Sequence, residues 1–240
     1  MRRVLNIAHR GFTRVFPDNS LESLDAAIEI GVDGVEFDVR ETSDKNFVVF
    51  HDPKLHGTSI RELTLAQLQG VKLEGKYKIP TLEEVLRLCG NRTRLFIELK
   101  AVESFPRLVE VLRSEAPLSD IMLLSFSRAL LTEALYLAPD IPRAIIVTSP
   151  GKSPLQLMES VQADAIVARY PFGGRKLVEA VHGVGRAIFV WGLPLPCCIN
   201  GVVKMDVDGI ISDFPDAVGK KLSEKLLICQ ADDQKPPKPE

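Results

Sequence analysis

The sequence predicts a (β/α)8 TIM barrel with an extra antiparallel hairpin strand after the second strand and a short insertion after that. Two observations predict this α/β fold. Short apolar runs alternate with amphipathic segments, as in βα units around a parallel sheet, and eight such units fit into about 225 residues. The 240 residues are 45 % hydrophobic, enough for one sizeable core. An open doubly wound sheet is the alternative, disfavoured because no glycine-rich phosphate motif follows any strand.

Eight apolar runs are the predicted barrel strands: residues 4–9, 34–39, 94–100, 121–126, 143–148, 164–169, 187–191 and 208–212. Predicted helices follow them at residues 20–31, 81–90, 103–115, 127–138, 153–162, 174–185, 199–206 and 216–227. Several helices have Ser, Thr or Asn near the start and Gly at the end, as helix caps require. Active sites of such barrels lie where the strands end, so residues at those positions are the functional candidates.

Residues 47–52, FVVFHD, interrupt the alternation of strands and helices. They follow the second strand after only a few residues, whereas a parallel crossover needs about a dozen. We therefore expect them to fold back as a hairpin, with Thr42 opposite Phe47. The same register places Asp38 opposite His51, so these two side chains are expected to share a face.

Three acidic residues lie in strands that should be buried. Glu36 and Asp38 are two apart in one strand and point to the same face, and Glu98 stands near the end of another. A solvated strand edge is one interpretation, but burying like charges without a counter-ion is costly. Carboxylates without a nearby cysteine suit Mg²⁺ or Ca²⁺ and argue against zinc. We therefore expect one of these two ions as a cofactor.

Four basic residues end strands on the same side of the predicted barrel: His9, Arg10, His51 and Lys100. A metal ion together with positive side chains stabilises phosphate charge. Two histidines can serve as base and acid because their pKa lies near neutrality. Composition and spacing thus indicate metal-assisted cleavage of a phosphate ester.

Two aromatic residues, Phe126 and Trp191, end strands on the active side and are candidates to line a substrate pocket. Packing inside the barrel is the alternative for both. Trp191 can hold a choline-like cation against its ring face. Asp213, in SDFPD, is interpreted as a residue that fixes the last loop rather than as a metal ligand.

Six segments of the chain together resemble a known family: AHRG at 8–11, residues 16–39, VVFHDPKL at 48–55, IPTLEEVL at 79–86, FIELK at 96–100 and VDGIISDFPD at 207–216. In this order they resemble the glycerophosphodiester phosphodiesterase family, over nearly the whole chain. The resemblance implies a barrel enzyme that hydrolyses glycerophosphodiesters to sn-glycerol 3-phosphate and an alcohol. It implies metal ligands Glu36, Asp38 and Glu98, acid–base residues His9 and His51, and phosphate-binding residues Arg10 and Lys100.

The chain also departs from the family pattern. PDNS at 17–20 replaces the usual PENT, the segment after Asp52 is short and lacks an arginine–threonine run, and GLPLPCC follows Trp191. PDNS is interpreted as the start of a helix and not as part of the chemistry. The other two differences concern the pocket wall and contacts to the leaving alcohol. Two other functions stay open: a lysophospholipase D-type phosphodiesterase, which needs an apolar entrance for an acyl chain, and a barrel that binds a phosphorylated ligand without turnover.

One catalytic barrel domain is expected over residues 1–228, with residues 53–80 as a short insertion that caps the barrel mouth. That segment is too short to bury a core of its own. The last residues, 229–240, are proline-rich and charged, and we expect them to form a disordered tail.

Charge and cysteine content limit the classes of binding partner and the cellular compartment that we expect. With 30 basic and 32 acidic residues the net charge is −2, so no overall basic field exists to hold nucleic acid or an anionic membrane. The four cysteines match neither a zinc site nor a disulfide framework and are interpreted as reduced thiols. No signal peptide or membrane span is recognisable. We expect a cytoplasmic enzyme with a small-molecule substrate and no stable membrane anchor; the sequence does not indicate an oligomeric state.

Overall fold

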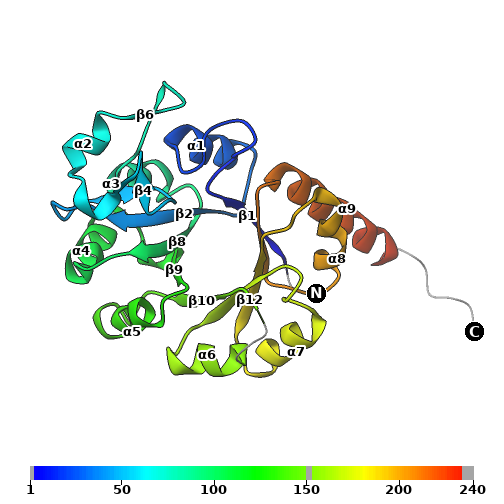
Figure 1. Ribbon diagram of the computed structural model, residues 1–240. Coiled ribbons are helices and arrows are strands. Elements are labelled where there is room, and N and C mark those ends of the chain that lie inside the picture. The colour runs from blue at the N-terminus through cyan, green and yellow to red at the C-terminus, as the bar shows by residue number, and fades with distance from the viewer. Residues whose placement is uncertain (1–2, 150–152, 234–240) are drawn as a thin grey trace, which may run out of the picture.

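Eight parallel strands close into a barrel in the structure, a computed structural model that describes residues 3–149 and 153–233 (Figure 1). Neighbouring strands follow the order β1, β2, β8, β9, β10, β11, β12 and β13, and β13 pairs back with β1. Their bounds are β1 Leu5–His9, β2 Gly34–Glu41, β8 Arg94–Ala101, β9 Ile121–Ser125, β10 Arg143–Val147, β11 Ala165–Arg169, β12 Ala187–Trp191 and β13 Gly209–Ser212. The predicted fold class is confirmed.

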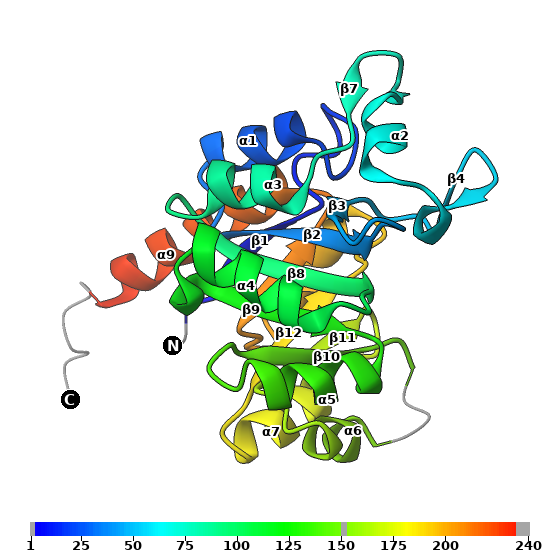
Figure 2. The same ribbon diagram turned by 90° about the vertical axis from the view of Figure 1, so that its left-hand side faces the viewer.

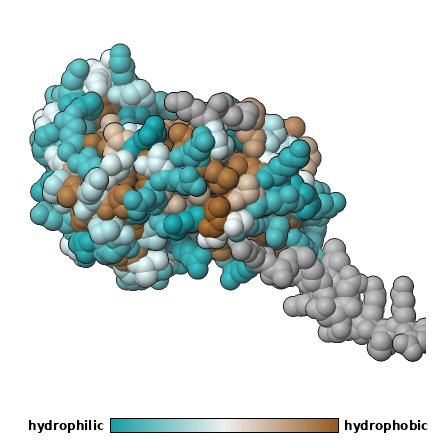
Figure 3. All heavy atoms as spheres, turned by 90° about the horizontal axis from the view of Figure 1, so that it is seen from below, coloured by the Kyte–Doolittle hydropathy of each residue, from teal (hydrophilic) through white to brown (hydrophobic). Residues whose placement is uncertain are grey.

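Helices surround the barrel on its outside (Figure 1): α1 Leu21–Glu29, α3 Leu82–Cys89, α4 Phe105–Glu115, α5 Arg128–Leu137, α6 Pro154–Ser160, α7 Arg175–Gly183, α8 Ile199–Val203 and α9 Pro215–Asp233. The predicted caps are present at α1 and α3. The Ser20 hydroxyl accepts the N–H of Ser23, and Thr81 and Glu84 form a reciprocal capping box. Seen from below, hydrophilic residues cover most of the outer surface, with hydrophobic residues between them (Figure 3).

The barrel floor is formed by two aromatic rings. Phe96 of β8 and Phe189 of β12 meet edge-on inside the barrel, with ring centroids 5.3 Å apart. Glycine makes room for both: a Cβ at Gly34 would lie 2.8 Å from the Phe96 ring, and one at Gly209 would lie 2.7 Å from the Phe189 ring. Because inward-facing residues recur every second position, the next inward positions on these strands stand above this floor.

Aspartates that precede three strands fix the register at the start of the barrel strands. Asp164 donates its N–H to the Arg143 carbonyl (2.7 Å), and its carboxylate accepts the N–H of Arg143 (3.1 Å). The same reciprocal pair occurs between Asp33 and Asn6 and between Asp208 and Ile188. Each pair ties the residue before one strand to its neighbour, so the other ends of these strands meet at fixed heights.

The hairpin strand β3, Phe47–Val49, runs antiparallel to β2 as expected, but its register differs from the prediction by one residue. Glu41, and not Thr42, pairs with Phe47. Thr42 instead closes the turn: its N–H donates to the Asn46 carbonyl (2.9 Å), and its hydroxyl accepts the N–H of Asn46 (3.0 Å). Lys45 in this turn is left-handed, with φ of 62°. The side-chain bond of Thr42 selects this tighter turn.

Glu41, the last residue of β2, stabilises the start of α4. Its carboxylate accepts the N–H groups of Glu103 (2.5 Å) and Ser104 (2.8 Å) and the hydroxyl of Ser104 (2.7 Å). The helix has no side-chain cap of its own at Ser104, so a carboxylate from another element takes that role. Burial alone would raise the pKa of Glu41, but these bonds outweigh it and hold the pKa below its usual range.

The insertion at 53–80 consists of β4 Lys54–Leu55, β5 Thr58–Ser59, a 3-10 turn at Ile60–Glu62, α2 Leu65–Gln69, β6 Lys72–Leu73 and β7 Tyr77–Lys78. Leu55, Ile60, Leu68 and Ile79 of the insertion form a small buried apolar cluster together with Val48 of β3. The insertion lies beside the hairpin, above β2 and β3 (Figure 2). Although this whole segment is described, none of its residues lines the pocket at the carboxyl ends of the barrel strands. The hairpin anchors the insertion to one side of the barrel.

The last helix is longer than predicted. Because no Gly or Pro occurs between Gly219 and Pro236, the helix α9 continues through residues 229–233, the first part of the expected disordered tail. Residues 234–240 lie outside the described residues. No helix in the described part of the chain has the length and hydropathy needed to span a bilayer.

Candidate active site

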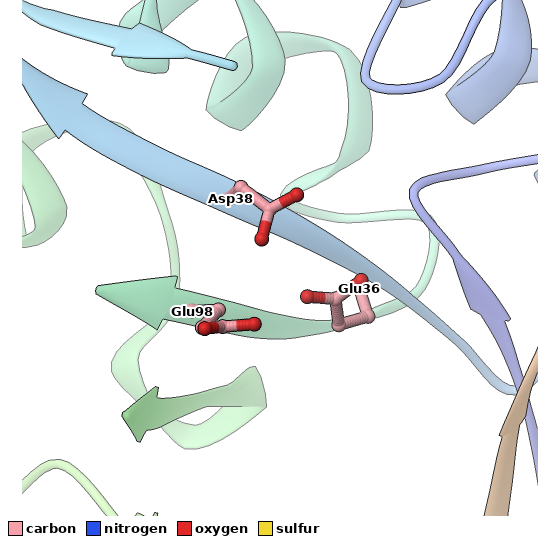
Figure 4. Close-up of side chains that lie close together, drawn as sticks. All are labelled: Glu36, Asp38 and Glu98. Atoms are coloured by element: carbon pink, nitrogen blue, oxygen red, sulfur yellow. The ribbon is translucent and has the colours of Figure 1, made fainter. Parts of the chain in front are cut away.

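Glu36, Asp38 and Glu98 converge at one point inside the barrel (Figure 4). Asp38 of β2 and Glu98 of β8 are directly paired in the parallel sheet, and Glu36 is two residues before Asp38 on the same face. One carboxylate oxygen of each residue lies within 4.8 Å of the other two, and all three side chains are buried. The convergence that the sequence predicted is therefore present.

The charge in this cluster is only partly compensated by the protein. Lys100 Nζ lies 3.2 Å from Asp38 Oδ1 and 2.6 Å from Glu98 Oε1, and neither of these buried oxygens has another hydrogen-bond partner among the described residues. Burial and the charge of Asp38 raise the pKa of Glu36 to about 8. Burial also raises the pKa of Glu98. Three buried carboxylates that share so few cationic partners fit a hard divalent cation, which would compensate the charge that Lys100 leaves.

Asp38 is the carboxylate that the protein holds in its ionised form. Burial alone would raise its pKa, but the charges of Lys100 and Arg10 outweigh it and hold the pKa below the usual range. Arg10 Nε lies 3.1 Å from Asp38 Oδ2. Asn19 donates to the same oxygen (2.9 Å) and accepts the backbone N–H of Asp38 (3.1 Å). Asn19, in the PDNS segment that the sequence indicated only as a helix start, therefore belongs to the site.

The loop after β1 turns sharply to bring Arg10 over the acids. Arg10 and Gly11 are both left-handed, with φ of 55° and 90°. A Cβ on Gly11 would lie 2.5 Å from the backbone and the hydroxyl of Ser23, so only glycine fits. The Arg10 N–H donates to the Glu36 carbonyl (2.8 Å), and its guanidinium reaches Asp18 (3.1 Å). The HRG motif thus encodes a backbone conformation as well as a cation.

His9 is held by Asp213. The register of β1 with β13 pairs Ala8 with Ser212, so the next residues, His9 and Asp213, are neighbours. His9 Nδ1 lies 2.6 Å from Asp213 Oδ1, and Nε2 lies 3.9 Å from Glu36 Oε2. Burial alone would lower the pKa of His9, but the hydrogen bond with Asp213 and the charge of Glu36 outweigh it and raise the pKa. Asp213 fixes the imidazole as well as the last loop.

His51 lies near the other site residues, but the hairpin register that positions it differs from the predicted one. The shifted register places Phe50, and not His51, beside Asp38: the Phe50 N–H donates to the Asp38 carbonyl (2.9 Å). Arg40 then binds the carbonyl of His51 with both Nε (2.9 Å) and Nη2 (2.6 Å). His51 Nδ1 contacts Asp52 Oδ1 at 2.7 Å. The register of β2 with β8 shifts between Val39 and Arg40, so strand periodicity does not predict where the Arg40 side chain lies.

A pocket of about 150 Å³ brings the predicted residues together. Eight of the nine predicted site residues line it: His9, Arg10, Glu36, His51, Glu98, Lys100, Phe126 and Trp191. Asp38 does not line it and lies against Arg10 and Lys100. The remaining wall is apolar and is formed by Leu124, Ile146, Val167 and Ile211. Phe126 and Trp191 meet edge-on at 6.1 Å, and Lys100 Nζ lies 5.6 Å from the Phe126 ring centroid. One side of the pocket is therefore charged and the other apolar.

Comparison with known proteins agrees with this arrangement. The model of the glycerophosphoryl diester phosphodiesterase family matches residues 9–217. A glycerophosphodiester phosphodiesterase from Caldanaerobacter subterraneus subsp. tengcongensis is 27 % identical over 90 % of this chain and 96 % of its own. The crystal structure of a glycerophosphodiester phosphodiesterase from Parabacteroides distasonis, 27 % identical, superposes with a TM-score of 0.85 and covers 94 % of this chain and 99 % of that one.

The same fold occurs in a phosphodiesterase from Oleispira antarctica, whose structure holds the product sn-glycerol-3-phosphate. It is 24 % identical, has a TM-score of 0.84 and covers 90 % of this chain and 96 % of that one. The family match includes the HRG turn, the acidic cluster, both histidines and the Asp213 loop, and it extends over most of the chain. The chain therefore belongs to the glycerophosphoryl diester phosphodiesterase family and is an enzyme of that family.

Proposed function

We propose that this enzyme hydrolyses glycerophosphodiesters to sn-glycerol 3-phosphate and an alcohol, with a divalent metal ion and two histidines. One observation carries the proposal: two members of a buried cluster of three carboxylates, Glu36 and Glu98, line the same pocket as His9, His51, Arg10 and Lys100. A binding site for a phosphorylated ligand needs the cations but not the acids, whose burial is costly without a metal ion. The acids therefore favour catalysis over simple binding.

The metal ligands in this proposal are Glu36, Asp38 and Glu98, and the ion is Mg²⁺ or Ca²⁺. When bound, such an ion neutralises phosphate charge and makes a bound hydroxyl more acidic. Arg10 and Lys100 bind the non-bridging phosphate oxygens as charge-assisted donors. Phe126 and Trp191 line the apolar wall of the pocket, where they contact the carbon skeleton of the substrate.

The two histidines divide the proton transfers in this mechanism. Asp213 holds the proton on His9 Nδ1, which leaves Nε2, beside the acids, to accept the proton of the attacking hydroxyl. His51 lies nearer the solvent, with 35 % of its side chain exposed against 18 % for His9. It donates a proton to the oxygen of the departing alcohol, which leaves towards the solvent.

In the favoured route, the glycerol 2-hydroxyl attacks phosphorus, the bond to the alcohol oxygen breaks, and a cyclic glycerol phosphate forms. Water then opens the ring with the roles of His9 and His51 reversed. Direct attack by water is the competing route and forms no cyclic product. Phosphorus NMR of the reaction distinguishes them, since a cyclic phosphate that rises and decays in time supports the first, and a signal of glycerol 3-phosphate alone supports the second.

The central test is a coupled assay for glycerol 3-phosphate released from glycerophosphocholine and glycerophosphoglycerol, with Mg²⁺, with Ca²⁺ and with a chelator. We expect turnover that a chelator abolishes and one of the two ions restores. Turnover of lysophospholipid micelles in place of soluble diesters would identify a lysophospholipase D-type enzyme. Saturable binding without turnover under any metal would identify a binding protein and contradict the proposal.

We further propose that the enzyme works in the cytoplasm. The cysteines described by the structure, Cys89, Cys197 and Cys198, are free thiols, and free thiols persist in a reducing compartment. Fusion of the chain to a redox-sensitive fluorescent protein would test this placement in cells.

A further inference from the structure

Arg169 is an exposed residue above the pocket and is not one of the residues that line it. The sequence did not single it out. Arg169 is the last residue of β11 and is directly paired with Trp191 of β12. Val167, two residues earlier on the same strand, lines the pocket. Because side chains two apart in a strand share a face, Arg169 stands on the inner face one level above Val167.

The guanidinium of Arg169 is held over an aromatic ring of the pocket. Its central carbon lies 5.7 Å from the centroid of Trp191, which lines the pocket wall. The backbone at Gly192 is left-handed, with φ of 72°, and a Cβ there would lie 3.4 Å from Arg169 Cγ. The chain thus turns directly after Trp191, and Gly192 lies beside the arginine stem. This is the cation–π geometry that arginine favours.

The charge of Arg169 is not compensated by the protein. Among the side chains of residues 3–149 and 153–225, no carboxylate lies within ion-pair distance of it, whereas Arg10 contacts both Asp18 and Asp38 and Lys100 contacts both Asp38 and Glu98. A cation beside a partly closed pocket without its own counter-ion attracts an anionic group of a ligand.

Arg169 is also remote from the acidic cluster. In the closed sheet, β11 is four strands from β2 in either direction, so it stands opposite the strand that carries Glu36 and Asp38. Figure 1 shows its neighbours β10 and β12 across the ring from β2. A substrate whose phosphate lies at the acids and at Arg10 therefore reaches Arg169 only with the part that points away from them.

We propose that Arg169 selects the alcohol half of the substrate and favours alcohols that carry a carboxylate or a phosphate group over alcohols that carry a quaternary ammonium. The inference rests on the proposed diesterase activity and names its substrate class. A choline-like cation would have to share the Trp191 ring with a guanidinium of the same charge, and like charges this close to one another repel. An anionic alcohol instead receives the two-pronged donor geometry of arginine.

The experiment compares three diesters of glycerol 3-phosphate that differ in the charge of the alcohol. The alcohols are choline, its neutral isostere 3,3-dimethylbutanol, and 3-hydroxypropionate. We measure kcat/KM for each with the metal-loaded enzyme, and binding of each to chelator-treated protein by calorimetry as a readout that needs no turnover. We expect the anionic diester to exceed the choline diester by roughly tenfold, with the neutral one between them, and the difference to shrink at high salt.

Substitutions at Arg169 test whether this residue causes the preference for the anionic diester. R169Q should reduce the ratio of kcat/KM for the anionic diester to kcat/KM for the choline diester by roughly fivefold or more. R169E should make the choline diester the better substrate, and R169K should keep most of the wild-type preference. R113Q is the matched control, because Arg113 is a partly exposed arginine on α4, outside the barrel, and pairs with Asp140. It removes the same charge from the protein and should leave the ratio unchanged.

Two results would overturn the inference. An equal loss of kcat/KM on all three diesters in R169Q would mean that Arg169 binds the glycerophosphate half that they share. Unchanged ratios in R169Q and R169E would mean that the arginine only covers the tryptophan. If wild-type protein hydrolyses none of the three with either metal, the proposed function fails, and the calorimetric ranking still decides the role of Arg169.

Discussion

His9 Nδ1 and Asp213 Oδ1 lie 2.6 Å apart, which joins the first strand of the barrel to the loop after the last one. Burial alone would raise the pKa of Asp213, but the hydrogen bond with His9 outweighs it and lowers the pKa. The carboxylate is therefore ionised and accepts the proton of Nδ1, so the other ring nitrogen is left for chemistry. The imidazole is oriented by a partner 204 residues away in the sequence.

This pair predicts the effect of Asp213→Asn. The amide no longer stabilises an Nδ1 proton, so kcat should fall roughly 10- to 100-fold while KM changes little. The control is Asp52→Asn, since Asp52 makes a similar contact to His51 but is 67 % exposed, and we expect a smaller loss there. Nitrogen-15 NMR of His9 should report a changed tautomer only in the Asp213 variant. A change in KM alone, with kcat and tautomer preserved, would contradict this role.

Metal binding should depend on pH through Glu36. Its pKa in the metal-free protein is raised to about 8, so near neutral pH the carboxyl must lose a proton before it can bind a cation. The affinity should increase as pH rises from 6 towards 8 and level off above. Calorimetry in buffers of different ionisation enthalpy should count about one proton released at pH 7.

The metal-free protein should show the opposite trend in stability. Because the folded pKa of Glu36 lies above its ordinary value, this group contributes stability at low pH that is lost as pH rises towards 8. Added metal should therefore stabilise the fold more at pH 8 than at pH 6, by thermal denaturation. Glu36→Gln should reduce the pH dependence of both measurements, and a metal affinity that is constant from pH 6 to 8 in the wild type would contradict the assignment.

Removal of the Glu41 carboxylate should destabilise the fold. Glu41→Gln weakens three hydrogen bonds at the start of α4, and bonds to a buried charged group contribute about 1–3 kcal/mol. The folded pKa is lowered, so this stability is present above the ordinary value and is lost as pH falls through the folded pKa. The difference in unfolding free energy between wild type and variant should thus be largest near neutral pH and shrink in acid.

Gly11→Ala tests the turn of the HRG motif. Left-handed strain costs about 1–2 kcal/mol for a residue with a side chain, and here the new Cβ also meets Ser23 at 2.5 Å. The matched control is Gly57→Ala, because Gly57 has nearly the same φ, +87°, with nothing within 4 Å. We expect the Gly11 variant to lose more unfolding free energy than the Gly57 variant, and to lose activity because Arg10 is displaced. Equal losses would show that strain alone matters.

The strands, the helices outside them and the acidic triad could be predicted from local patterns. Period-two alternation places Glu36 and Asp38 on one face wherever the strand lies, and eight βα units leave few ways to close a sheet. Asn19 and Arg40 could not be predicted in the same way. Asn19 reaches Asp38 through a left-handed backbone, and Arg40 binds a carbonyl eleven residues away, so neither contact leaves a periodic signal.

His51 shows most clearly what could not be predicted from the sequence. His51 lines the same pocket as Glu36 and Glu98, yet the register from which its position was predicted is wrong by one residue. A turn stabilised by the Thr42 side chain shifts the pairing, and the Arg40 guanidinium then fixes the chain beyond β3. The energies that choose between two hairpin registers come from a few specific bonds, which hydrophobic patterning does not contain.

The sequence by itself determined which residues could carry chemistry and that they would meet at one end of a barrel, since strand periodicity and parallel topology follow from local composition. Only the tertiary structure decided which partner each one has: Asp213 for His9, Arg40 for His51, and Trp191 for Arg169. Those pairings depend on the relative heights of separate strands. Heights are set by hydrogen bonds and packing between segments far apart in the chain, and so they exist only once the barrel has closed.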